Sequence, residues 1–294
     1  MSRFWSGSAL ALGISRSVVQ GTFLFAVLAT SFSALGRLPV TILRPTGLMK
    51  LLPWGFYDRL LTPSGMFALK TLLVICLFSG AIGFLTPVST KLSFLLVLFY
   101  QGLVRSFGHY NHDEMIAVYY LAVLAFTPCG DAFSIDHWTR RRSVNKPLFV
   151  YGYPIFLMQL LMAWLYFSSA LVKFRVAGLK YFSADNLPVL AILHSLDNLH
   201  DTNFKLAFWL PGIRGALPFV VGIVLVWELL FPLVLFSRKA RWWILSFGVL
   251  FHVSTMLLMN IFFPYQLAMY LIFIDWDRLA GWLNKPAQQT SRST

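Results

Sequence analysis

Long apolar runs without a charged residue constrain this chain more than any other feature. The clearest run occupies residues 148–172 and is closed by Lys173. One helix needs about 20 consecutive apolar residues to cross a bilayer core, so a run of this length is typical of a membrane span. With 58% hydrophobic and only 12% charged residues among 294, the chain cannot hide its apolar side chains inside one soluble core. We therefore expect an integral membrane protein.

Eight stretches have a length and composition suited to spanning helices. Their apolar residues run continuously instead of alternating, which favours helices over a transmembrane barrel. The sequence predicts an all-α, polytopic integral membrane bundle of about eight transmembrane helices with one re-entrant or interfacial segment. The stretches are 17–36, 66–86, 91–108, 114–128, 148–172, 217–236, 242–263 and 264–282. The fourth is short and the last follows its neighbour after Pro264 alone, so this count can differ by one.

The chain contains no linker rich in Ser, Gly or Pro, and no repeat period. This pattern predicts one transmembrane domain over residues 13–284, preceded by an N-terminal segment, 1–12, and followed by a polar, disordered tail, 285–294. The N-terminal segment has no clear cleavage site, so we expect it to be retained. Residues 187–194 form an apolar stretch too short to span, and they are the expected re-entrant or interfacial element.

The formal net charge of +13 is explained by topology and lipid attraction, and we expect no nucleic-acid partner. Basic residues follow the fourth, sixth and eighth predicted spans, which places both termini in the cytoplasm of, we expect, a bacterial inner membrane. These residues are Arg140, Arg141, Arg142, Lys146, Arg238, Lys239, Arg241, Arg278 and Lys285. A second group falls on the opposite side, where an interfacial helix near residues 47–61 would accommodate it: Arg37, Arg44, Lys50 and Arg59.

Two polar residues lie in the middle of apolar stretches. Glu228 is one of only eleven carboxylates in the chain, and an ionised group inside a span costs at least ~2.5 kcal/mol, so it must be protonated, paired or turned toward a polar cavity. It either locks two helices together or serves a function. His252, at the centre of the seventh predicted span, either donates a hydrogen bond to a neighbouring helix or belongs to a site.

A histidine pair precedes the fourth predicted span. On a helix, His109 and His112 would share a face, and Asp113 and Glu114 lie nearby, which is a spacing that some metal sites use. The sequence offers no second histidine-rich motif and no thiolate pair to complete the ligand set, so we expect no metal. Capping of the fourth helix by Asp113 is the alternative.

Two further residues have competing interpretations. Asp136 follows Ser134 in a loop, where either residue could cap a short helix, or the aspartate could partner a cation if the loop folds into the bundle mouth. Lys173 either extends to the lipid headgroups as a span anchor or lies in an apolar pocket as a titratable amine. Arg175 and Lys180 already serve the interface after this span, which favours the pocket.

These residues, taken in order, resemble a known family. The pattern is Asn111-His112, then Ser134-Ile135-Asp136, then Tyr166-Phe167 followed by Lys173, then Phe251-His252. It is similar to the transmembrane domain shared by vitamin K-dependent gamma-glutamyl carboxylase and its bacterial relatives, the horizontally transferred transmembrane (HTTM) domain proteins. The resemblance covers roughly residues 13–282.

The resemblance implies a helical bundle with an interior cavity that admits a quinone or vitamin K-like hydroquinone from the lipid, and a site facing the periplasm. In the carboxylase, a lysine deprotonates the hydroquinone, oxygen then generates a strong base, and that base removes a proton from glutamate before carbon dioxide adds. By position, Lys173 matches this lysine and His112 the histidine near it. Asp136, Glu228 and His252 are expected to shape the cofactor site. Desolvation would supply Lys173 as a neutral amine.

The chain departs from the carboxylase pattern in three places. Val172 stands where the carboxylase has a second lysine, Tyr181 lies near the position of a tryptophan, and the sequence ends at Thr294, before any large extramembrane region. We therefore expect a short, bacterial-type member: a quinone- or lipid-coupled enzyme, of carboxylase-like lyase or hydroquinone-dependent type, with an unknown substrate. The alternative is a non-enzymatic membrane module that binds lipid or quinone, or a subunit of a larger assembly. A transporter is less favoured because no repeat is found.

Overall fold

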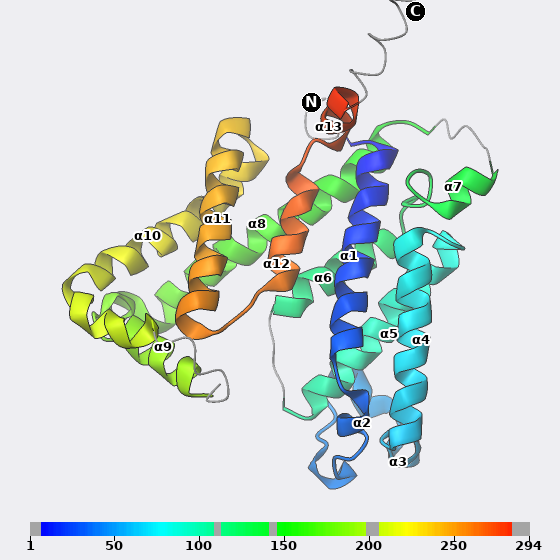
Figure 1. Ribbon diagram of the computed structural model, residues 1–294, viewed down its shortest axis with the longest axis horizontal. Helices are drawn as coiled ribbons and strands as arrows, with labels where there is room; N and C mark the ends of the chain where they lie inside the picture. Colours follow the sequence, from blue (N-terminus) through cyan, green and yellow to red (C-terminus); the bar gives the residue numbers. More distant parts are fainter. Residues whose placement is uncertain (1–6, 109–112, 141–145, 198–205, 284–294) are drawn as a thin grey trace, which may run out of the picture. The chain divides into compact units, whose positions relative to one another are not determined.

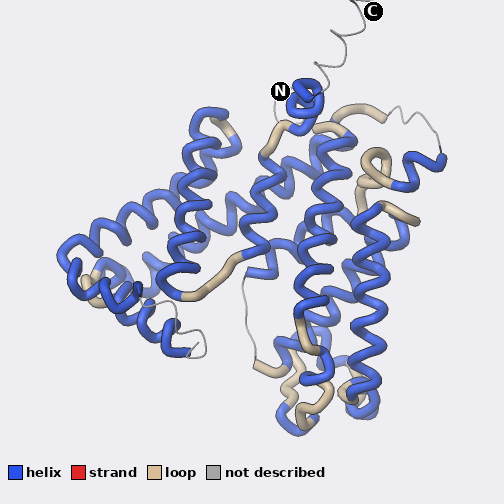
Figure 2. The backbone as a smooth tube through the Cα atoms, viewed as in Figure 1, coloured by secondary structure: helices blue, strands red, loops and turns tan. Residues whose placement is uncertain are grey.

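A computed structural model describes residues 7–108, 113–140, 146–197 and 206–283 of the chain (Figure 1). Within these ranges every regular element is a helix, and loops join the helices without a strand between them (Figure 2). The predicted all-α membrane bundle is therefore confirmed.

The helices differ widely in length. The long ones are α1 (Ala9–Ala29), α4 (Pro63–Ile82), α5 (Thr86–Ser106), α8 (Phe149–Ala177), α10 (Leu217–Leu230) and α11 (Arg238–Met259). The shorter α-helices are α2 (Phe32–Leu35), α3 (Trp54–Leu60), α6 (Asp113–Ala125), α7 (Ile135–Arg140), α9 (Asn186–Asp197), α12 (Pro264–Met269) and α13 (Trp276–Leu283). The 3-10 segments are η1 (Val40–Ile42), η2 (Gly47–Leu51), η3 (Gly178–Phe182), η4 (Leu206–Ala216), η5 (Phe231–Leu235) and η6 (Tyr270–Phe273).

Six helical segments of the described chain are long and apolar enough to cross a membrane, against about eight expected. They are Ala9–Ala29, Pro63–Ile82, Thr86–Ser106, Phe149–Phe182, Leu206–Leu235 and Arg238–Met259. The other two predicted spans coincide with the short helix α6 and with the broken series α12, η6 and α13. Pro264 starts this series, and proline is tolerated in the first turn of a helix but not within one.

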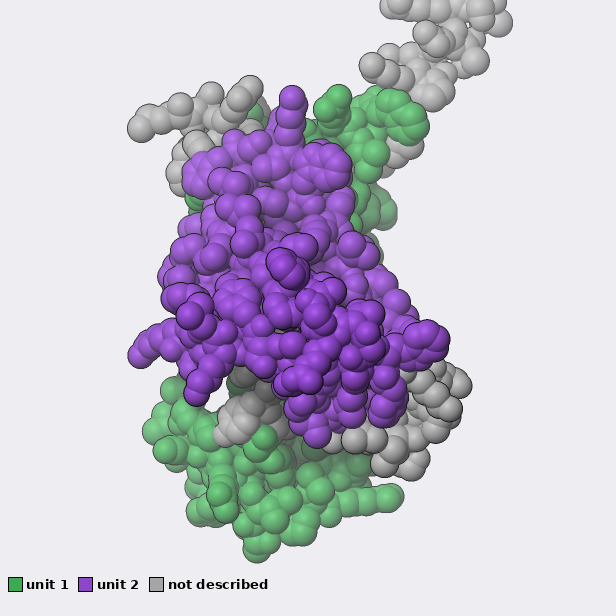
Figure 3. Space-filling model, turned by 90° about the vertical axis from the view of Figure 1, so that its left-hand side faces the viewer, with its two compact units in different colours: residues 1–158, 271–294 green, residues 159–270 purple. Residues whose placement is uncertain are grey.

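The chain divides into two compact units, which Figure 3 colours separately. Unit 1 comprises residues 1–158 and 271–294, and unit 2 comprises residues 159–270. In unit 1, α4 packs against α1 and α5, and α5 packs against α6. In unit 2, α11 packs against α9, α10 and η5. Helix α8 begins in unit 1 and ends in unit 2.

Local signals explain where the spans begin and end. Helix α4 starts with proline after Thr62, whose hydroxyl accepts a hydrogen bond from Gly65 N at 3.1 Å, and it stops at Gly83, whose φ of 72° is left-handed. Ser237 caps α11 in the same way, accepting from Ala240 N at 3.2 Å. The other end of α11 is Asn260, also left-handed with a φ of 53°.

The first span begins earlier than predicted, at Ala9 instead of residue 17. The predicted stretch, 17–36, starts directly after Arg16, whereas the structure buries the Arg16 side chain inside α1. Backbone carbonyls of the same unit surround the guanidinium, which explains how the helix accommodates it.

The short apolar stretch 187–194 forms helix α9, which is too short to cross a bilayer core. Its Ala191 packs in a buried cluster with Ala207 and Leu210 of η4 and Leu217 of α10. Ser195 also reaches the carbonyl of Leu258 in α11 at 3.3 Å. The element is therefore a packed, non-spanning helix of unit 2, as the sequence predicts for this stretch.

Candidate functional site

Lys173 and Glu228, the two charged residues that the apolar pattern singled out, form an ion pair within unit 2. Lys173 Nζ of α8 donates to Glu228 Oε1 of α10. The lysine side chain is 27% exposed and the glutamate side chain 3%. The amine is therefore directed to a buried carboxylate.

The neighbouring cations behave differently. Arg175 and Lys180 follow in the same part of unit 2, and both side chains are exposed. They suit the interface role that long basic side chains have at the ends of spans. Lys173 is the cation of this group that points inward.

A second polar group lies on the same face of α8. Tyr166 precedes Lys173 by seven residues, or about two helical turns. Its hydroxyl lies 2.6 Å from His252 Nε2 of α11 and 2.6 Å from the hydroxyl of Tyr270. All three side chains are buried. The hydrogen bonds thus run from His252 through Tyr166 to Tyr270. We call these three residues the Tyr–His–Tyr chain, with Tyr166 as its middle member.

Aromatic rings surround this chain. The Tyr166 ring stacks on Phe231 with centroids 4.2 Å apart and meets Trp227 edge-on at 4.9 Å. His252 lies 5.0 Å from Phe263 between ring centroids. These rings leave the polar atoms in a medium of low dielectric, where hydrogen bonds and charges act more strongly than in water.

Two buried polar atoms of this site make no hydrogen bond within the described part of the chain. They are Glu228 Oε2 and His252 Nδ1. Buried polar groups in proteins are nearly always satisfied, so each such atom calls for an explanation, and a bound ligand is one. A carboxylate oxygen can accept a hydrogen bond from a hydroxyl group, and a protonated imidazole nitrogen can donate one to a carbonyl oxygen.

An apolar groove of about 1000 Å³ lies between α10 and α11, on the other side of Trp227. Its walls include Phe219, Gly222, Leu230, Trp243 and Leu250. Trp227 lines the groove and also contacts Tyr166, and its indole nitrogen donates to Ile244 O at 2.9 Å. This indole is thus a fixed wall shared by the groove and the aromatic shell of the Tyr–His–Tyr chain.

The structure brings together only some of the predicted site residues. Lys173 with Glu228, and His252 with Tyr166, are collected in unit 2. His112 lies outside the described residues. Asp136 belongs to unit 1, where its carboxylate accepts from Leu85 N at 3.1 Å and Thr86 N at 2.6 Å and so caps α5.

Capping was one of the two alternatives for the loop around Asp136. The carboxylate also lies close enough to the Arg16 guanidinium to attract it, which was the other alternative. Ser134 caps α7, since its hydroxyl accepts from His137 N at 2.9 Å. Asp136 therefore caps α5, whereas the short helix α7 is capped by Ser134.

Arg16 and Tyr270 are two polar residues that the sequence analysis missed. Arg16 Nε donates to Cys129 O at 3.1 Å, its Nη1 to Gly80 O and to Ala81 O at 2.9 Å, and its Nη2 to Phe133 O. It thereby gives the carbonyls of Gly80 and Ala81, in the last turn of α4, a second donor beside Gly83 N and the Ser17 hydroxyl. Arg16 directly precedes the predicted stretch 17–36, and the apolar residues before it, 9–14, could have indicated that the helix continues past this charge. Tyr270 gave no signal beyond a hydroxyl in an apolar run.

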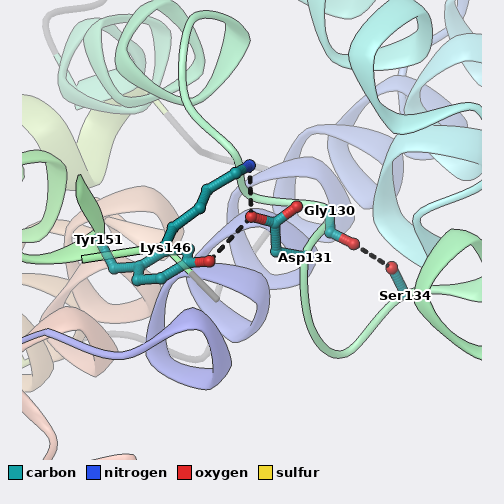
Figure 4. Close-up of polar contacts among 5 residues, drawn as sticks. All are labelled: Gly130, Asp131, Ser134, Lys146 and Tyr151. Carbon is teal, nitrogen blue, oxygen red and sulfur yellow. Dashed lines mark hydrogen bonds and ion pairs between the residues drawn. The ribbon is translucent and has the colours of Figure 1, made fainter. Parts of the chain in front are cut away.

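A further polar cluster in unit 1 fixes the loop after α6. Asp131 Oδ2 accepts from Lys146 Nζ at 2.7 Å and from the Tyr151 hydroxyl at 2.9 Å, while the Ser134 hydroxyl donates to Gly130 O at 2.6 Å (Figure 4). Asp131 therefore ties the loop to the start of α8. Lys146, which the sequence pattern indicated only as a topology signal, donates one of the two hydrogen bonds to the Asp131 carboxylate.

Comparison with family models, with curated proteins and with solved structures gives no match to this chain. Among the described residues, no three His, Cys, Asp or Glu side chains gather as metal ligands would.

Proposed function

We propose that this integral membrane protein is a quinone- or lipid-coupled enzyme in which the Lys173 amine acts as a base inside the bundle. In this proposal it is a bacterial-type relative of the HTTM and vitamin K-dependent carboxylase domain, placed in an inner membrane with both termini cytoplasmic. The observation that carries the proposal is the pairing of Lys173 with the buried Glu228.

The pair offers a proton two positions. The pair can hold this proton on the lysine nitrogen, which gives an ammonium and a carboxylate. It can also hold the proton on a glutamate oxygen, which gives an amine and a carboxylic acid. Two ions in an apolar site cost several kcal/mol of desolvation each, which the neutral arrangement avoids. In the neutral arrangement Lys173 has a lone pair that can accept a proton from a bound molecule. Glu228 then stabilises the ammonium that forms.

The surroundings of the pair fit a ligand with an oxygen-bearing ring and an apolar tail. Glu228 Oε2 and His252 Nδ1 are buried without hydrogen-bond partners in the described chain, and they could meet its hydroxyl or carbonyl oxygens. A bound hydroquinone would supply an acidic O–H group at this position. The family resemblance also implies roles for His112 and Asp136, but the proposal rests on the residues of unit 2 alone, because Asp136 caps α5 in unit 1 and His112 lies outside the described residues.

Replacing Lys173 by arginine tests the proposal most sharply. Arginine keeps a cation opposite Glu228 but cannot give up its proton near neutral pH, so it preserves the ion pair and removes the base. Lys173→Ala removes the base too, but it also leaves Glu228 without its partner. Arginine is therefore the deciding variant and alanine the supporting one.

The measurement is the oxidation of a short-chain hydroquinone to the quinone by dissolved oxygen, which takes up the two electrons, in the presence of the purified full chain in air-saturated detergent solution and above the uncatalysed rate. We expect turnover by the wild type, a loss of at least about 100-fold in Lys173→Arg with an unchanged melting temperature, and normal turnover in Lys180→Arg. Full activity in Lys173→Arg would show that Lys173 is not the base. No turnover by the wild type would exclude this substrate class.

A non-enzymatic membrane module that binds lipid or quinone is the second candidate. The apolar groove beside Trp227 favours it, because a groove can hold a tail without any chemistry at the ion pair. Binding of the hydroquinone by both wild type and Lys173→Arg, with turnover by neither, would support this candidate.

A further inference from the structure

The segment between the first two spans folds into a small structure on unit 1. Residues 37–61 contain η1, η2 and α3, and we call this segment the platform. It lies where α1 ends and α4 begins (Figure 1). Its inner side is buried through Leu43, Met49, Tyr57 and Leu61. The platform is therefore a packed element and not a loose connection.

The end of α5 holds the platform in place. Arg44 N donates to Ser106 O at 2.7 Å, directly at the last residue of α5. A Cβ on Gly102, one turn earlier, would lie 3.0 Å from Met49 Sδ, so the backbone of α5 packs against η2. Tyr57 closes the platform on itself by donating its hydroxyl to Met49 O. The platform thus has a fixed position relative to α5.

The lengths of the neighbouring spans set the depth of the platform in the membrane. Helices α1 and α5 have 21 residues each and α4 has 20. By helical rise each is about 30 Å long, which is the thickness of a hydrocarbon core. Ala29, Pro63 and Ser106, the ends of these helices beside the platform, therefore lie where hydrocarbon meets the headgroups. The platform lies at the same depth.

The outer side of the platform exposes apolar side chains in one row. Leu48 is 73% exposed and Leu51 79%. Both belong to η2, and a 3-10 helix has about three residues per turn, so residues three apart lie on the same face. Trp54, three residues further and 55% exposed, follows them at the start of α3. Such an apolar row is what an element lying in a membrane interface buries among lipids.

Basic side chains accompany the apolar row. The platform contains four basic residues and one acidic residue, which gives it a net charge of +3. All five side chains are exposed, and none makes a hydrogen bond or an ion pair within the described part of the chain. They are Arg37, Arg44, Lys50, Arg59 and Asp58. The charge of the platform is therefore available to a partner.

The positive-inside pattern does not account for these cations. With both termini in the cytoplasm, as proposed above, α1 carries the platform to the opposite side of the membrane, whereas that pattern concentrates Lys and Arg on the cytoplasmic side. Attraction to an anionic lipid surface is a second reason for basic residues beside a span, and it contributes ~1 kcal/mol for each one near the surface. This attraction fits the depth of the platform.

We propose that the platform docks on the lipid surface beside unit 1 and selects anionic headgroups. Leu48, Leu51 and Trp54 enter the boundary of the acyl region, and Arg44 and Lys50 pair with lipid phosphates. The depth of the platform and its net positive charge favour a lipid surface over a protein partner. The docking involves unit 1 alone, so it does not depend on the proposed chemistry at Lys173.

Spin labelling of the full chain in nanodiscs tests the docking. In a Cys76→Ser/Cys129→Ser background, Leu51→Cys carries a single nitroxide at a position exposed enough to accept it. Collisions of the nitroxide with oxygen, which concentrates in hydrocarbon, are compared with collisions with a neutral, water-soluble nickel chelate. The two rates give the ratio of immersed to water-exposed label. The nanodiscs contain phosphatidylcholine alone or an equal mixture with phosphatidylglycerol, with identical acyl chains.

We expect the label at residue 51 to be immersed in the mixed nanodiscs. The immersed-to-exposed ratio should be at least about tenfold higher there than in phosphatidylcholine, because each of several basic residues contributes ~1 kcal/mol, or about fivefold. A label at Leu72→Cys, an exposed position within α4, should be immersed equally in both. Raising NaCl to about 1 M should reduce the difference at residue 51, since the Debye length then falls to about 3 Å.

Lys50→Gln tests the selection of headgroups. It should lower the immersed-to-exposed ratio at residue 51 about fivefold in the mixed nanodiscs and leave the ratio in phosphatidylcholine unchanged. Lys91→Gln, at another exposed lysine of unit 1 that lies outside the platform, is the matched control and should change neither ratio.

Three outcomes would overturn the proposal. A label at residue 51 that meets the nickel chelate freely in both lipids would place the apolar row in water. Equal immersion in both lipids would show that the basic residues do not select a headgroup. A label that meets neither oxygen nor the chelate would be covered by protein, which would assign the row to a second copy of the chain or to another protein.

Discussion

The hydroxyl of Tyr166 on α8 lies 2.6 Å from Nε2 of His252 on α11. The same hydroxyl is 2.6 Å from that of Tyr270, so one oxygen connects side chains from three elements of unit 2. Because the aromatic shell keeps water away, these contacts define a single arrangement of the polar atoms. Removing these hydrogen bonds should lower the free energy of unfolding as well as the activity.

Tyr166→Phe should destabilise the protein by about 1–3 kcal/mol. The change deletes one oxygen and leaves the buried polar atoms of His252 and Tyr270 without that partner. Unfolding in mixed micelles with increasing SDS measures the loss. Tyr153→Phe, an exposed tyrosine on the same helix, is the control and should change the unfolding free energy by less than ~0.5 kcal/mol. Equal effects of both substitutions would contradict the buried chain.

The Lys173–Glu228 pair should show strong coupling in a double-mutant cycle. Lys173→Met leaves a buried carboxylate unpaired and should cost roughly 3 kcal/mol. Adding Glu228→Leu removes the stranded carboxylate, so the double variant should recover most of that loss. The same SDS titration gives all four unfolding free energies. Simple addition of the two single effects would mean that the pair contributes nothing to folding.

Arg16→Lys should destabilise unit 1 although it preserves the charge. The guanidinium serves carbonyls in three directions from one planar group, and an ammonium on a shorter reach cannot satisfy all of them. At least about 2 kcal/mol should be lost, because buried carbonyls are left without donors. The readout is the melting temperature in detergent. Arg37→Lys, at an exposed position, should leave it unchanged.

Gly83→Ala should lower the melting temperature. The residue has a φ of 72°, which costs an L-residue roughly 1–2 kcal/mol, and a Cβ here would lie 2.3 Å from Ser134 Cβ. Helix α4 and the loop that carries Asp136 would have to separate. Gly281→Ala meets nothing and should raise or preserve stability. A Gly83→Ala protein as stable as the wild type would show that this turn is not as tight as described.

Cys129 should resist maleimide in the folded protein. Burial raises the pKa of its thiol to about 11, so the reactive thiolate is scarce at every pH below that value, and the side chain is also inaccessible. In a Cys76→Ser background the only remaining thiol is Cys129. Mass spectrometry should detect no adduct at pH 8 until denaturant is added, when labelling should become complete. Rapid labelling of the folded variant would contradict the burial.

Hydrophobic continuity was sufficient to predict the fold class and most spans. All six long apolar segments overlap a predicted stretch, because a bilayer imposes a length that the sequence displays directly. Arg16 shows where that logic stops. The first predicted span starts directly after this charged residue, yet carbonyls from α4 and from a loop distant in sequence accommodate it inside the helix, and such partners cannot be read from a linear pattern.

The candidate site was predictable in part for the same reason. Rare polar residues in apolar runs, Glu228 and His252, pointed to the polar centre of unit 2, and the cost of burying them indicated that they need partners. Which partners they have was not predictable. Tyr270 is one hydroxyl in an apolar run, and its meeting with Tyr166 depends on how α12 and η6 return to α8.

Trp227 lies between the apolar groove and the Tyr–His–Tyr chain, so these two features could change independently. Its indole is held by the Ile244 carbonyl, so the groove side can vary in shape while the Tyr166 side stays fixed. Substitutions at Gly222 or Leu250 would alter what the groove accepts without touching an atom of the polar centre. Substitutions on the groove side of Trp227 alone could therefore reshape that surface while the polar interior around Tyr166 stays the same.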